Sequence, residues 1–255
     1  HAQRGNARGD AMQLMIAAAP ELRQTACAAR LPVANAAYRL EGGYLCALPM
    51  PRSLQGGALL LTGWDGVWRD TAAQGILREC RARQYGAVIV PFPDPSLVQT
   101  LAPPLYRAGL ALWVHEHCAH AAPGGRVLVC TALSGGDMEE RLTRCCRAFG
   151  ADRIVLDLQR LRMDFPLPCP GGEGVYLTGE QLAQRQRGRA VFYSRTLGAR
   201  YFTYRSGSGT RFVLFDDGDT LRRKIALGRQ LGITRGLLTL PECGDILDEV
   251  IRKEP

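Results

Sequence analysis

Three closely spaced histidines are the residues best suited to metal chemistry. The segment His115-Glu-His-Cys-Ala-His120 follows the apolar run at 110–114. On a strand, His115 and His117 would project to the same side, and His120 could join them from the following loop. A metal-dependent hydrolase is therefore one hypothesis, although it needs ligands from other strands. The only other histidine is His1, and a hydrated strand end accounts for the same residues, so we predict no metal and no cofactor.

Three acidic residues are candidates for proton transfer. Glu116, Asp157 and Glu242 each lie near the predicted carboxyl end of a strand, where barrel enzymes place their catalytic groups. A carboxyl group held there can exchange a proton with a bound substrate. These are the acids to examine if the chain is catalytic.

Strands and helices are predicted to alternate along the chain. Capping-box spacings place helix starts at 71, 97, 138 and 179, and Pro103 and Pro104 are expected to break or kink the second helix. Apolar runs predict strands at 58–63, 87–92, 111–116, 127–132, 153–158 and 236–240.

A hairpin and a capped helix follow in the last third of the chain. Alternating residues predict strands at 201–204 and 211–215 around a glycine-rich turn, with another at 190–194. Asp216, Asp217 and Asp219 then crowd the start of a helix that ends at Gly232.

This order over residues 200–243 resembles the end of glycoside hydrolase family 18 domains of the spore-germination, cortex-lytic type. Asp217, Lys224 and Gly236 match the pattern of that family, whereas Leu240 occupies its tryptophan position. Residues 153–168 resemble the seventh-strand segment of the family, and residues 126–135 resemble its sixth-strand segment without the tyrosine and aspartate that contact substrate. The resemblance implies glycan contacts at Asp164, Phe165, Tyr201 and Tyr204.

The same resemblance bears on catalysis. Residues 76–92 resemble the helix and fourth strand that carry the motif D-G-x-D-x-D-x-E, and Phe92 stands at the position of its acid. In this family the acetamido oxygen of the substrate attacks, an aspartate orients it and the glutamate protonates the leaving oxygen. A competing register over 152–159 places Gln159 at the acid position. Neither register retains the glutamate, so we predict no catalytic residue.

Residues 1–50 resemble a degenerate LysM module, a type that binds N-acetylglucosamine polymers. Gly9-Asp10, the run at 14–17, Asn35 and the segment 40–49 carry the resemblance. The predicted fold is therefore α/β: a small LysM-like module at 1–50, then a shortened or incomplete (β/α)8 TIM-like barrel with an inserted β-hairpin at 51–255. Any glycan affinity would then reside mainly in the module.

Composition limits the partners. The formal charge of +8 comes almost wholly from arginines scattered over predicted helices, which predicts no nucleic-acid partner. No apolar run approaches the roughly 20 residues of a membrane span. Nine cysteines, an odd number, argue against a disulfide framework and favour a reducing compartment, whereas the resemblance suggests a spore or cell envelope.

Three functions remain open. The leading hypothesis is a catalytically inactive relative of family 18 that binds an N-acetylglucosamine-containing glycan or serves structurally in the envelope. The second is an active glycoside hydrolase with altered catalytic residues, and the third is the metal-dependent hydrolase. The sequence does not specify the oligomeric state.

Overall fold

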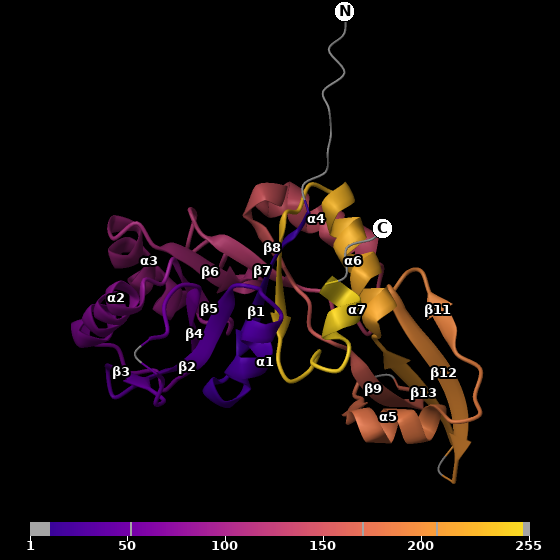
Figure 1. Ribbon diagram of the computed structural model, residues 1–255. Helices are drawn as coiled ribbons and strands as arrows, with labels where there is room; N and C mark the ends of the chain where they lie inside the picture. The colour runs from indigo at the N-terminus through magenta and orange to yellow at the C-terminus, as the bar shows by residue number, and fades with distance from the viewer. Residues whose placement is uncertain (1–10, 52, 170, 208, 252–255) are drawn as a thin grey trace, which may run out of the picture.

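Eight parallel strands form a closed barrel surrounded by helices (Figure 1). The computed structural model describes residues 11–51, 53–169, 171–207 and 209–251. Strand β14 pairs with β1, and β1 pairs with β2, so the sheet closes on itself. In barrel order the strands are β1 (Gln13–Ala18), β2 (Val33–Glu41), β4 (Ala58–Trp64), β5 (Ala87–Val90), β6 (Ala111–His115), β7 (Arg126–Cys130), β8 (Ile154–Asp157) and β14 (Arg235–Thr239).

Closure of the barrel corrects two expectations. Strands β1 and β2 lie within residues 1–50, together with β3 (Tyr44–Ala47), which pairs antiparallel with β2. The segment assigned to a LysM-like module thus supplies the first two barrel strands, and the barrel is not shortened there. The hydrogen bonds of β1 to both of its neighbours are the physical reason, because they leave no separate unit ending at residue 50. Residues 1–10, with Gly9 and Asp10, lie outside the described residues.

The helices begin where side chains or prolines satisfy free backbone groups. The carboxylates of Asp94 and Asp137 accept amide hydrogen bonds at the starts of α3 and α4. Helix α2 begins at Asp70 without a side-chain cap, so the capping box expected from Thr71 is wrong. The helical elements of the barrel are η1 (Pro20–Leu22), α1 (Arg23–Ala28), α2 (Asp70–Arg83), α3 (Pro95–Arg107), η2 (Glu116–Cys118), α4 (Met138–Phe149), η3 (Ala151–Arg153), α6 (Gly218–Gln230) and α7 (Leu247–Ile251).

The proline pair does not break α3, which continues through Pro103 and Pro104 to Arg107. A proline leaves the carbonyl four residues earlier without its amide partner. Here those carbonyls belong to Gln99 and Thr100, both on the exposed side of the helix. Water can therefore replace the missing donors.

None of the described helices is long and apolar enough to cross a membrane.

Apolar side chains pack both outside the barrel, between the strands and the helices, and inside it, in the lumen. The outward faces of the strands pack against the surrounding helices in two large apolar clusters. The lumen is filled by alanines and larger aliphatic side chains, together with the aromatic side chain of Trp113. The inward-facing residues are Ala17, Ala34, Ala58, Leu60, Ala87, Ile89, Trp113, Leu128, Val155 and Leu237.

An antiparallel sheet is inserted between β8 and α6 and projects to one side of the barrel (Figure 1). The strands expected at 201–204 and 211–215 lie within β12 and β13, which pair directly. Helix α5 begins with a capping box at Thr178 and covers one face of the sheet. The inserted elements are β9 (Arg162–Leu167), β10 (Val175–Tyr176), α5 (Gly179–Gln186), β11 (Phe192–Ser194), β12 (Ala199–Ser206) and β13 (Gly209–Phe215).

A buried ion pair anchors this insertion to the barrel. Lys224 of α6 donates to Asp216 over 2.8 Å, and both side chains are almost fully buried. Asp216 also accepts hydrogen bonds from the backbone amide of Leu161, just after β8, and from the Thr220 hydroxyl. The strand that enters the insertion and the strand that leaves it are therefore tied to the same carboxylate.

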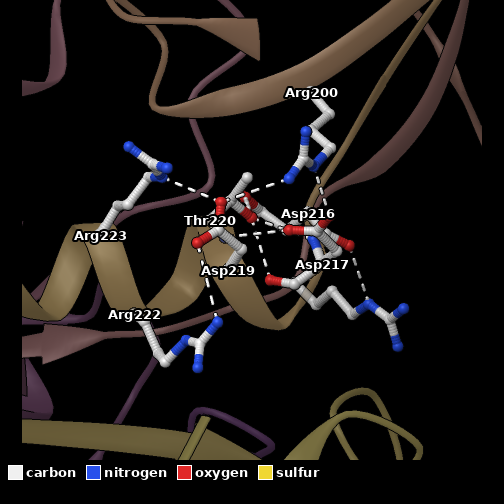
Figure 2. Close-up of polar contacts among 8 residues, drawn as sticks. Arg200, Asp216, Asp217, Asp219, Thr220, Arg222 and Arg223 are labelled. Carbon is white, nitrogen blue, oxygen red and sulfur yellow. Dashed lines mark hydrogen bonds and ion pairs between the residues drawn. The ribbon is translucent and has the colours of Figure 1, made fainter. Parts of the chain in front are cut away.

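Arginines surround the acidic start of α6 (Figure 2). Arg200 of β12 pairs with Asp217 and Asp219, and Arg222 and Arg223 of the helix pair with Asp219. The acidic residues stabilise the positive end of the helix dipole. The arginines offset the repulsion between the neighbouring carboxylates. The insertion is thus held to α6 by charge pairs at the surface as well as in the core.

We expect Lys224→Met to lower the free energy of unfolding by about 3–5 kcal/mol, because it leaves the Asp216 carboxylate buried without a cation. Urea denaturation measures this change. Arg222→Met, which changes a partly exposed arginine paired with Asp219 at 3.7 Å, serves as the matched control and should unfold close to wild type. Equal stability of Lys224→Met and wild type would show that the buried pair does not anchor the insertion.

Candidate functional site

Four polar side chains face inward at the carboxyl end of the barrel. His115, Cys130, Asp157 and Thr239 each stand two residues after a lumen residue, so strand alternation directs them toward the same mouth. All four are partly buried. Cys130 and Asp157 are direct partners in the register between β7 and β8. Cys130 and Thr239 belong to no motif in the sequence, and only the inward alternation of their strands identifies them.

Asp157 is the acid of this mouth whose protonation is most perturbed. Burial raises its pKa from 3.8 to about 6, and the negative charge of Glu242 adds to the increase. The side-chain amide of Gln159 donates to the carboxylate over 2.7 Å and opposes the shift. Burial also raises the pKa of the neighbouring Cys130 thiol, which disfavours a thiolate nucleophile. The mouth therefore holds a carboxyl group that can exchange a proton near neutral pH.

The three predicted acids are not equivalent. The structure brings Asp157 and Glu242 within electrostatic reach of each other. Glu116 instead pairs with Arg141 of α4 over 2.5 Å, and Arg141 also donates to the backbone carbonyl of Cys130. Glu116 is therefore held toward a helix outside the barrel, as an ion-pair partner.

The histidine segment does not keep the strand geometry expected for it. Strand β6 ends at His115, and His117 lies in the 3-10 turn η2. The backbone amide of His117 donates to Nδ1 of His115 over 3.2 Å. Their rings meet edge to face at 4.7 Å, and His120 is exposed. Within the described ranges, no group of three or more His, Cys, Asp or Glu side chains is placed to hold a metal ion.

The position expected for a catalytic glutamate faces away from the lumen, because Ile89 of β5 faces inward, Val90 faces outward, and Phe92 lies on the same side as Val90. Strand β5 is the fourth strand of the closed barrel, and Phe92 follows it by two residues. Phe92 is partly buried against the apolar cluster under α2 and α3. The nearest following acid, Asp94, caps α3. Leu240, at the expected tryptophan position, is buried in the core outside the barrel.

The four residues expected to contact glycan lie on two faces of the inserted sheet. Asp164 is buried and accepts hydrogen bonds from Tyr204 and Arg211, and it pairs with Arg185 of α5. Tyr204 packs in the cluster beneath α5. Phe165 and Tyr201 pack on the opposite face. Because side chains alternate along a strand, the four residues do not form one surface.

The face opposite α5 carries a row of aromatic rings. Tyr201 stacks at a tilt between Phe192 and Phe212, with ring centroids 5.6 and 5.5 Å apart. Phe165 continues the row at 6.4 Å from Phe212. We call Phe165, Phe192, Tyr201 and Phe212 the aromatic face. Ala132, just beyond β7, packs against the same cluster, so this face adjoins the barrel mouth.

Solved structures share this architecture at low sequence identity. No protein-family model matches the chain, and no curated protein matches it by sequence. The chain is similar to the spore cortex-lytic enzyme SleL of Bacillus megaterium, with 15% identity and a TM-score of 0.64 over 97% of this chain and 76% of that one. It is similar to a chitinase of Chromobacterium violaceum, with 15% identity and a TM-score of 0.67 over 96% and 100% of the two chains. It is also similar to a family 18 N-acetylglucosaminidase of Paenibacillus barengoltzii, with 13% identity and a TM-score of 0.65 over 94% of this chain and 97% of that one. The fold is thus that of family 18 barrels.

The Asp157 carboxyl should titrate at about pH 6 in the folded protein, and Glu242→Gln should lower that value. Because the folded pKa lies above the unfolded value, protonation of Asp157 stabilises the fold, and this contribution is lost as pH rises through about 6. Carbon-13 NMR of labelled aspartate measures the titration, with Asp157→Asn as the assignment control. A titration near pH 4 would contradict burial of this group.

Proposed function

We propose that the protein is a catalytically inactive relative of family 18 glycoside hydrolases that binds an N-acetylglucosamine-containing glycan at the barrel mouth, along the aromatic face. The proposal rests above all on the carboxyl end of β5, the fourth barrel strand, where the resemblance expects the acid: Pro91, Phe92 and Pro93 follow the strand and none of them can donate a proton. A benzyl side chain cannot protonate a leaving oxygen. Two similar structures, SleL and the chitinase, bear names of glycan-degrading enzymes.

The aromatic face supplies the binding surface in this proposal. Phe192 is 54% exposed, and Tyr201 and Phe212 are partly exposed beside it. Consecutive rings offer apolar area to the carbon–hydrogen face of a sugar, and burial of that area favours binding. Asp157 and Gln159 are polar partners for sugar hydroxyl and amide groups at the adjacent mouth. A spore or cell envelope is the setting that the similarity to SleL suggests for such binding.

A second candidate function is an active glycoside hydrolase with altered acids. The observation in its favour is the raised pKa of Asp157 and its proximity to Glu242. A pair of neighbouring carboxyl groups could act as acid and base at a glycosidic bond. This alternative differs from our proposal in one measurable property, the turnover of substrate.

Chitopentaose binding should weaken at least fivefold, about 1 kcal/mol, in each of Phe192→Ala and Tyr201→Ala, because each variant removes a ring from the aromatic face. Isothermal titration calorimetry measures the affinity. The matched control is Tyr44→Ala, which removes an exposed ring from β3. Unchanged affinity in both aromatic-face variants would refute this binding surface.

The purified protein should release no reducing ends from chitooligosaccharides or spore-cortex peptidoglycan. The reason is the absence of a proton donor at Phe92. Reducing-end assays and mass spectrometry check this result across pH 4–8, a range chosen to include the Asp157 titration at about 6. Turnover that co-purifies with the protein and disappears in Asp157→Asn would establish the hydrolase instead.

A further inference from the structure

At the end of the barrel opposite the mouth, two arginines lie near a buried indole N–H, and none of the described acidic residues pairs with them. Arg126 begins β7 and Arg235 begins β14, and each precedes a lumen residue by two positions. Strand alternation therefore directs both side chains into the lumen at its amino end. Trp113 of β6 is the direct register partner of Arg126 and also faces inward.

Neither Arg126 nor Arg235 forms an ion pair with any acidic residue that the structure describes. The Arg126 guanidinium lies 5.7 Å from the centre of the Trp113 ring, and Arg235 donates only to the hydroxyl of the adjacent Thr234. The indole N–H of Trp113 is buried and has no hydrogen-bond partner.

The arrangement is electrostatically unfavourable without an anion. Burial lowers the pKa of Arg126, and the charge of Arg235 lowers it further. Two like charges held at the same end of the lumen repel each other, and a buried donor without an acceptor destabilises the folded protein. An anion between the guanidinium groups would remove both penalties. Arg153, which lies just before β8, does not need such an anion, because its guanidinium group already donates to the backbone carbonyls of Gly125 and Ala122.

We propose that the amino end of the barrel binds a phosphate group through Arg126 and Arg235, with the indole N–H of Trp113 as a further donor. Phosphate fits because its negative charge near neutral pH nearly balances the positive charge of two guanidinium groups. Its several oxygens can also accept hydrogen bonds from both groups. A singly charged carboxylate would leave part of the positive charge uncompensated. This site lies at the opposite end of the lumen from the proposed glycan site, so the two proposals can fail independently.

Inorganic phosphate is the first probe, titrated into the full chain in a buffer of low chloride concentration. We expect saturable binding by calorimetry and a phosphate-dependent rise in Tm. Arg126→Gln and Arg235→Gln should each bind at least tenfold more weakly. The matched control is Arg107→Gln, which changes an exposed arginine at the end of α3 and should bind like wild type.

Thermal unfolding without phosphate and the binding of other anions test the proposal further. In phosphate-free buffer, Arg126→Gln should have a Tm at or above that of wild type, because it relieves the repulsion from Arg235; this also shows that the variant folds. Glycerol 3-phosphate binding as tight as that of inorganic phosphate would assign the site to esterified phosphate, and weaker binding would assign it to the free ion. Acetate binding as tight as phosphate, no phosphate binding by wild type, or phosphate binding as tight as wild type in both arginine variants would overturn the proposal.

Discussion

Strand β1 is the element on which the rest of the structure depends, because its backbone pairs with β14 on one side and β2 on the other. These hydrogen bonds close the barrel and fix the order of every other strand. They make β5 the fourth strand, whose carboxyl end carries Phe92 between two prolines and no acid before Asp94. They also create an enclosed lumen whose two ends differ in chemistry. One end has a carboxyl group of raised pKa, and the other has two arginines without an acidic partner among the described residues.

The inserted sheet depends on a second constraint, the buried pair of Asp216 and Lys224. Because Asp216 also accepts from the amide of Leu161, the pair fixes both ends of the insertion against the barrel. The aromatic face is thereby held next to Ala132 at the mouth. A rigid connection matters for a binding surface, since rings that are already positioned lose little freedom when a ligand stacks on them.

The strands with long apolar runs could be predicted from the sequence, and six of the eight barrel strands lie at or within a residue or two of the expected positions. Strands β1 and β2 could not, because their inward positions are filled by small residues such as Ala17 and Ala34, which give a weak strand pattern. The candidate site was only partly predictable. Asp157 could be found from its place at a strand end, but its raised pKa depends on burial and on Glu242, which is distant in sequence. The arginines of the opposite end resemble scattered surface charge until the barrel register brings them together.

The central claim is that the mouth and the aromatic face bind a glycan without cleaving it. The most direct test is a crystal structure of the protein after prolonged soaking with chitopentaose. The account predicts an intact pentasaccharide with a sugar ring stacked on Tyr201 or Phe192 and another sugar within hydrogen-bonding distance of Asp157. A cleaved oligosaccharide at the mouth, or an ordered sugar bound elsewhere with the aromatic face vacant, would contradict it.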